Sequence, residues 1–249
     1  MHLPFLRNKS SLPAAPVDFS FLGTDLHSHL IPGIDDGSPD METSVSLISS
    51  LCQMGYKKII TTPHVMQEGY KNNAAIISAG YQKVKQELAA RHLTPDFHAA
   101  AEYLLDPGLV EMVGKNEPLL TISENKILLE FSFMAPPLSL HKILYEIQVK
   151  GYALIIAHPE RYPYFHHQPE QYQKLTDMGC ELQMNLLSLT GYYGKSIRKA
   201  ALKLLDGQYV SYLGTDLHHQ RHIEHLHLLL KDHSLMKKLA GYPWKNKLL

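Results

Sequence analysis

Short apolar runs alternate with longer amphipathic segments along almost the whole of this 249-residue chain. A short apolar run is typical of a buried strand, and apolar residues at every third or fourth position are typical of a helix. Several of the expected helices end in glycine, a common helix stop signal. Strands are expected at 19–27, 57–64, 97–105, 125–133, 152–160, 180–185 and 209–218. Helices are expected at 40–55, 74–92, 138–151, 169–179, 195–207 and 221–240.

Seven strands alternating with helices favour a parallel α/β sheet, and units of similar length favour its closure into a barrel. No Ser/Gly/Pro-rich run and no long block of one charge interrupts the middle of the chain. We therefore expect one domain over 1–249, with 1–20 as an N-terminal extension.

Metal-ligating side chains end almost every expected strand. In chain order these are His27 and His29, His64, Glu102, Glu130, His158, and Asp216 with His218; the sixth strand ends in Asn185. In a β/α barrel the carboxyl ends of the strands share one rim, so these groups are expected to converge. A single His-x-His pair would be weak evidence, but core histidines have no reason to select one end of every strand.

The string LGTDLH occurs twice, at 22–27 and 213–218. The sequences around the two copies do not match further, which argues against an internal duplication. The first and last strands of a closed barrel are neighbours, so both copies are expected to deliver side chains to the same rim.

Other histidines are expected in loops or on exposed helix faces: His166, His167, His219, His222, His225, His227 and His233. The two cysteines, Cys52 and Cys180, are expected to be packing residues. A cysteine-based phosphatase would need arginine six residues after the cysteine, where this chain has Lys58 and Leu186. The chain also has no phosphate-binding glycine motif of a nucleotide enzyme.

Lysine plus arginine and aspartate plus glutamate are balanced at 24 each, which gives no support to a nucleic-acid partner. The N-terminal residues have no apolar core of signal-peptide length, and no later run approaches a membrane span. We expect a cytoplasmic protein without membrane insertion. The oligomeric state is left open.

Six motifs in order, DLHSHLIPGIDDG, TTPH, AAEY, LLEF, AHPERY and GTDLH, resemble the PHP (polymerase and histidinol phosphatase) superfamily. The resemblance is to its bacterial tyrosine-protein phosphatases, which act beside the tyrosine kinases of capsule and exopolysaccharide synthesis. It runs from about residue 22 to the last expected helix. It implies a distorted (β/α)7 barrel, three divalent metal ions, often manganese, and a phosphotyrosine protein, such as a tyrosine autokinase, as substrate and partner.

The resemblance also implies roles for individual residues. The first metal would bind His27, His29, Glu102 and Asp216; the second would share Glu102 and bind Glu130 and His158; the third would bind Asp36, His64 and His218. Arg161 and Arg221 fall where family members hold phosphate-binding arginines. Imidazole and carboxylate ligands suit manganese, iron or zinc, and the absence of thiolates disfavours a structural zinc site.

The chemistry of this set is consistent with phosphate-ester hydrolysis. Four carboxylates facing three divalent cations leave a positive pocket, which suits a phosphate dianion, and guanidinium groups add charge-assisted hydrogen bonds. Residues expected to orient the ligands are Asp25, Asp35, Glu160 and Asn185, with cap or turn roles as the alternative. Tyrosines that could line a cleft are Tyr103, Tyr162, Tyr164, Tyr192 and Tyr193, with loop packing as the alternative.

Three other functions remain open at this point. A histidinol-phosphate or other small phosphomonoester phosphatase of the same superfamily would use the same metals. An amidohydrolase would usually place a modified lysine at the end of the fourth strand, where this chain has Glu130. A non-catalytic metal-binding regulatory module would not need a complete ligand set with two arginines.

Overall fold

The computed structural model describes residues 18–249 of the chain. The described strands are β1 Thr24–Asp25, β2 Lys58–Thr61, β3 His64–Val65, β4 Asp96–Ala99, β5 Glu102–Leu104, β6 Lys126–Glu130, β7 Ala153–Ala157, β8 Glu181–Asn185 and β9 Tyr212–Gly214. The helices are α1 Met41–Gln53, α2 Ala74–Ala90, α3 Pro107–Gly114, α4 Leu140–Val149, α5 Pro169–Asp177, α6 Leu186–Thr190, α7 Lys195–Asp206, α8 Gln220–Leu230 and α9 His233–Ala240. Short 3₁₀ turns lie at Pro159–Arg161, Pro163–Phe165 and Asn246–Leu248.

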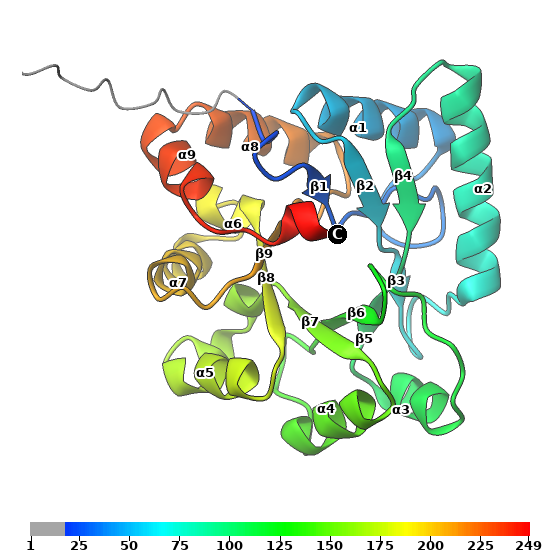
Figure 1. Ribbon diagram of the computed structural model, residues 1–249. Helices are drawn as coiled ribbons and strands as arrows, with labels where there is room; N and C mark the ends of the chain where they lie inside the picture. The colour runs from blue at the N-terminus through cyan, green and yellow to red at the C-terminus, as the bar shows by residue number, and fades with distance from the viewer. Residues whose placement is uncertain (1–17) are drawn as a thin grey trace, which may run out of the picture.

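The strands form two parallel sheets, in the orders β1-β2-β4 and β3-β5-β6-β7-β8-β9. They surround a common centre, and the helices lie on the outside (Figure 1). The first and last strand regions meet through a parallel bridge between Ser28 and Leu217 and a 2.9 Å bond from His29 N to Leu217 O. The α/β class and the barrel-type arrangement are therefore as the sequence predicts, although strand pairing is interrupted and the ladder is not continuous.

Two expected strands are each divided in the structure. The expected strand 57–64 consists of β2 and β3, and Pro63 lies between them, where it cannot donate a ladder hydrogen bond. The expected strand 97–105 is divided into β4 and β5. Only the two residues of β1 within 19–27 have strand geometry. The sheet is distorted at these breaks.

The helix predictions differ from the structure at three places. The short helix α6, which directly follows β8, was not expected. The expected helix 221–240 is two helices, because Asp232 caps α9 by accepting a 3.0 Å hydrogen bond from Leu235 N. Helix α3 was not expected, although Asp106 is its N-cap, with a 2.9 Å bond from Leu109 N, and Pro107 occupies its first turn. The Asp-Pro pair in the sequence was a usable signal for that start.

Apolar packing separates into two layers. A small cluster fills the centre of the ring: Leu26, Ile60, Ala100, Ile122, Leu128, Ile155, Ala157 and Tyr212. A larger cluster packs the outer faces of the strands against the helices. Because these side chains fill the centre, the ring is a packed core rather than a pore. Burying each leucine or isoleucine contributes about 1.5–3 kcal/mol to stability.

The segment before Leu249 closes the end of the ring opposite the strands' carboxyl ends. Buried Asn246 donates to Thr24 O and Leu213 O and accepts from Leu213 N. Of the expected extension 1–20, residues 1–17 lie outside the described residues, whereas Phe19 is buried and bonds from its N to Met54 O at 2.7 Å. Within 18–249, no helix combines the length and the apolar character that a membrane crossing requires.

Candidate metal centre

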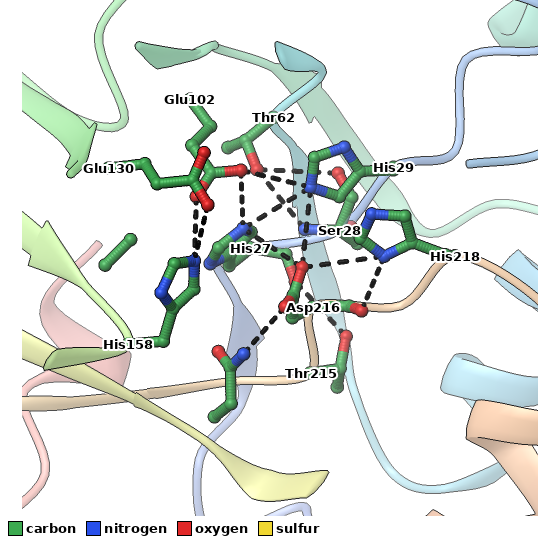
Figure 2. Close-up of polar contacts among 12 residues, drawn as sticks. His27, Ser28, His29, Thr62, Glu102, Glu130, His158, Thr215, Asp216 and His218 are labelled. Carbon is green, nitrogen blue, oxygen red and sulfur yellow. Dashed lines mark hydrogen bonds and ion pairs between the residues drawn. The ribbon is translucent and has the colours of Figure 1, made fainter. Parts of the chain in front are cut away.

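All nine predicted metal-ligating side chains gather at the carboxyl ends of the strands. Figure 2 labels most of them and shows that they converge from separate segments, with Glu102 and Asp216 among the imidazoles. Four overlapping groups have ligand atoms within 4.8 Å of one another: His29, Asp36, His64 and His218; His27, His29 and Asp216; His27, Glu102 and His158; and His64, Glu102 and Glu130.

Glu102 lies at the centre of the cluster and is fully buried. Its Oε2 atom is 3.1 Å from His27 Nε2, 3.1 Å from His64 Nδ1 and 3.3 Å from His29 Nε2. None of these contacts has hydrogen-bond geometry, so this oxygen and His64 Nδ1 have no hydrogen-bond partner among residues 18–249. Oxygen and nitrogen lone pairs that face one another in a buried space repel unless cations lie between them. The residues present therefore fit divalent metal ions.

The other carboxylates lie around this centre. Glu130 Oε1 is 3.5 Å from His158 Nε2, and Asp216 Oδ1 is 3.3 Å from His27 Nε2. Asp36, whose side chain is 51% exposed, lies at the mouth with Oδ1 3.5 Å from both His64 and His218. The exposed edge of the cluster is therefore the side from which a substrate can approach.

Two of the candidate ligands have left-handed backbone geometry, His158 with φ of 32° and Asp216 with φ of 51°. This region is costly for residues other than glycine and persists only where the surroundings hold it. His158 immediately follows β7, and Asp216 lies two residues after the end of β9. The turn at each position directs the side chain into the cluster.

The electrostatic environment acts differently on the imidazoles. Burial lowers the pKa of His27 and of His29, but neighbouring carboxylates, Glu102 and Asp216 beside His27 and Asp35 beside His29, outweigh burial and raise both. Burial lowers the pKa of His64 and of His158 to about 4. Burial also raises the pKa of Glu130 well above its usual range, and the neighbouring charge of Glu102 adds to this effect. A neutral imidazole is the form that binds a metal, and a cation at the centre would offset the cost of two close buried carboxylates.

The residues expected to orient the ligands have distinct contacts. Asp35 Oδ2 lies 2.8 Å from His29 Nδ1, and Asp35 also accepts from the backbone of Gly37 and His64. Asp25 instead accepts from Thr215 N at 2.9 Å and from its hydroxyl at 2.8 Å. These bonds join the two LGTDLH copies directly, so Asp25 links strands and does not touch a candidate ligand side chain.

Glu160 and Asn185 form a buried pair behind the site. Glu160 Oε1 accepts from Asn185 N at 2.9 Å and from the Ser188 hydroxyl at 2.7 Å. Burial raises the pKa of Glu160 to about 7, although these two bonds oppose the shift. Asn185 in turn donates from Nδ2 to Asp216 Oδ2 at 2.7 Å.

Arg161 lies beside the cluster between two aromatic rings. Its guanidinium carbon is 4.6 Å from the ring centroid of Phe133 and 4.3 Å from that of Tyr193, and Nη1 donates to Asp216 Oδ2 at 3.0 Å. Arg221 is exposed on the first turn of α8, 5.7 Å from the ring centroid of Tyr192. The structure places Arg161, but not Arg221, in the lining of the pocket above the cluster, so a phosphate contact by Arg221 stays a prediction.

That pocket has a volume of about 350 Å³. Besides Arg161 and the exposed faces of the candidate ligands, its lining comprises Met66, Tyr70, Phe133, Tyr193, His219 and His222. Of the tyrosines considered from sequence, only Tyr193 lies in this lining. The hydroxyls of Tyr103, Tyr162 and Tyr164 bond to backbone atoms elsewhere.

The expectation that His222 is a surface residue was wrong. His222 is buried, and its Nδ1 atom lies 3.1 Å from Asp216 O and 3.2 Å from His218 N. It therefore supports the turn that carries two candidate ligands. Sequence reasoning also missed Gln183, whose side chain contacts His27, and Phe133; neither residue carries a motif signal of its own.

A parallel α/β ring with imidazoles and carboxylates gathered at the carboxyl ends of its strands defines the class of barrel-type metalloenzymes. Within that class, the family model for capsular polysaccharide synthesis, CpsB/CapC, matches residues 23–242. This chain belongs to that family.

This chain also aligns with named relatives over most of their length. The chain is 29% identical to tyrosine-protein phosphatase YwqE of Bacillus subtilis, with 78% of this chain and 76% of the relative covered. It is 26% identical to putative tyrosine-protein phosphatase CapC of Staphylococcus aureus, with 88% and 84% covered. It is 28% identical to tyrosine-protein phosphatase CpsB of Streptococcus pneumoniae, with 78% and 82% covered.

Solved structures with a similar fold include a relative from the same group of tyrosine phosphatases. A structure from a study of YwqE from Bacillus subtilis and CpsB from Streptococcus pneumoniae, described as unique metal-dependent tyrosine phosphatases, superimposes with a TM-score of 0.75. Its identity to this chain is 26%, and 90% of this chain and 94% of that one are covered. A phosphotriesterase homology protein from Escherichia coli has a TM-score of 0.51 at 14% identity, which is a likeness of fold alone.

Proposed function

We propose that this chain is a metal-dependent phosphatase that hydrolyses phosphotyrosine in proteins. The main support is the pocket in which Arg161, held between Phe133 and Tyr193, adjoins a cluster of nine imidazole and carboxylate side chains. The relatives named tyrosine-protein phosphatases support the choice of phosphotyrosine.

Three divalent ions, manganese in preference to iron or zinc, are proposed for the cluster. The first would be held by His27, His29, Glu102 and Asp216; the second by Glu102, Glu130 and His158; and the third by Asp36, His64 and His218. When bound, such ions supply Lewis-acid stabilisation of the phosphate oxygens and lower the pKa of the attacking water.

The residues of the chain provide the remaining functions. Arg161 binds phosphate oxygens through its planar guanidinium, and the two flanking rings restrict its orientation. Phe133 and Tyr193 also offer aromatic faces to the ring of a phosphotyrosine. No cysteine is needed as a nucleophile, since Cys180 is buried and burial raises its pKa to about 12.

Membership of a family described by capsular polysaccharide synthesis supports a more specific proposal. We propose a tyrosine autokinase of polysaccharide synthesis or export as the physiological substrate and partner, with both proteins in the cytoplasm. Such a kinase would present phosphotyrosine on its own chain, where an open pocket can reach it.

Phosphate release from a phosphotyrosyl peptide, a phosphoseryl peptide and histidinol phosphate tests the proposal, with manganese supplied to the purified chain. The phosphotyrosyl peptide is expected to have the highest kcat/KM, and Glu102→Gln is expected to remove turnover of it. If histidinol phosphate is hydrolysed with the highest kcat/KM, the chain is a small-molecule phosphatase and the assignment of phosphotyrosine as substrate is wrong. The absence of hydrolysis with all three, despite bound metal, would favour a regulatory module.

A further inference from the structure

Strand β8 supplies amides rather than metal-ligating groups to the interior. Gln183 and Asn185 are separated by two positions, so their side chains lie on the same face of the strand. Both are fully buried beside candidate ligands that come from opposite ends of the chain, His27 and Asp216. A buried amide is stable only when its donors and acceptor are matched, so their partners are informative.

The two amides join those ligands in one continuous series of hydrogen bonds. His27 Nδ1 is 2.8 Å from Gln183 Oε1, Gln183 Nε2 is 2.9 Å from Asn185 Oδ1, and Asn185 Nδ2 is 2.7 Å from Asp216 Oδ2. We refer to Gln183 and Asn185 as the amide relay.

The direction of the relay follows from the chemistry of its Asp216 end. An ionised carboxylate only accepts, so Asn185 must present its NH₂ group to Asp216 and its oxygen to Gln183. Gln183 must then donate to Asn185 and present its own oxygen to His27. His27 must therefore carry its proton on Nδ1, and the lone pair of Nε2 is left facing Glu102 and Asp216, at 3.1 Å and 3.3 Å.

The neighbouring strand leaves room for the relay. A Cβ atom at Gly214 in β9 would lie 2.7 Å from Gln183 Nε2 and 2.8 Å from His27 Cβ. Both distances are shorter than side chains tolerate. The glycine of the second LGTDLH copy thus permits the close approach of His27 and Gln183.

We infer that Gln183 and Asn185 are positioning residues that act as a relay, in which the carboxylate of Asp216 fixes the His27 tautomer whose Nε2 atom can bind a metal ion. This inference rests on the proposed metal site. The relay orients two ligands of the proposed first metal ion together, so its loss weakens metal binding without removing a ligand.

Manganese affinity, measured by competition with a chelator, tests the relay in Gln183→Leu and Gln183→Glu. Asn246→Ala is the matched control, because Asn246 is an equally buried amide bonded to the same two strand regions at the opposite end of the ring. The control is expected to lower thermal stability and to bind manganese normally. Gln183→Leu is expected to weaken at least one manganese site by about 10–100-fold.

Nitrogen-15 NMR of the protein loaded with diamagnetic zinc gives the second measurement, with His27→Gln to assign the signal of His27. Wild type is expected to hold His27 with its proton on Nδ1, and Gln183→Leu to show a mixture of tautomers. Gln183→Glu retains an acceptor for His27 but not the donor to Asn185, so it is expected to keep the tautomer and still weaken manganese binding.

Wild-type manganese affinity in both Gln183 variants would overturn the relay, as would a mixed His27 tautomer in wild type. These results are separate from the substrate assignment. A chain that binds manganese through the relay but does not hydrolyse phosphotyrosine would retain this inference and refute the proposed function.

Discussion

Removing the guanidinium of Arg161 separates substrate binding from metal binding. The group is 22% exposed, lies 4.6 Å and 4.3 Å from two ring centroids, and donates to Asp216 Oδ2 at 3.0 Å. A preorganised charge-assisted contact of this kind contributes about 2–4 kcal/mol to stabilisation of the transition state. Arg161→Ala is therefore expected to lower kcat/KM on an aryl phosphate by a factor of about 30 to 1000.

Metal content is expected to be unchanged in Arg161→Ala, because Asn185 Nδ2 still holds Asp216 Oδ2 at 2.7 Å. Arg161→Lys is expected to recover only part of the rate, since an ammonium group cannot reproduce the planar fork. Arg198 is a control of the same residue type, because it is an exposed arginine whose Nε donates to Leu189 O outside the pocket. Activity of Arg161→Ala near that of Arg198→Ala would refute the phosphate-binding role.

Four further variants test other parts of the account. His158→Ala is expected to lower metal content and kcat/KM together, and retention of full metal occupancy would remove His158 from the ligand set. Cys52→Ser and Cys180→Ser are expected to keep turnover, with no phosphoenzyme trapped by rapid quenching; loss of turnover in a folded, metal-loaded variant would contradict the absence of a thiol nucleophile. Gly37→Ala would place a Cβ atom 2.2 Å from His29 O, which costs about 1–3 kcal/mol and is expected to lower Tm by about 2–12 °C; an unchanged Tm by calorimetry would contradict this packing.

The candidate ligands could be predicted because parallel strands align their carboxyl ends, so residues far apart in sequence share a rim. The limits of this reasoning are visible in the repeated LGTDLH string. Asp25 and Asp216 occupy the same position in the two copies, yet Asp25 bonds to Thr215 and Asp216 turns into the cluster with φ of 51°. That difference depends on the loop after each strand rather than on the repeated residues.

Other features depend on packing that no local pattern encodes. His222 lies in a helical sequence rich in histidine, and its burial reflects contacts with the turn of 216–218 and with the ring of Tyr192. Gln183 resembles any polar strand residue, and its contact with His27 joins positions 156 residues apart. The breaks between β2 and β3 and between α8 and α9 were predictable in principle, since Pro63 and Asp232 are local signals.

The central claim is that the cluster around Glu102 binds the metal ions that make the chain a phosphotyrosine phosphatase. The most direct test is to remove metal with a chelator, add manganese in known amounts, and measure bound metal and phosphate release from a phosphotyrosyl peptide in parallel. Activity is expected to be absent without metal, to return as about three ions bind per chain, and to stay absent in Glu102→Gln. Full turnover by the metal-free chain, or by Glu102→Gln, would contradict the account.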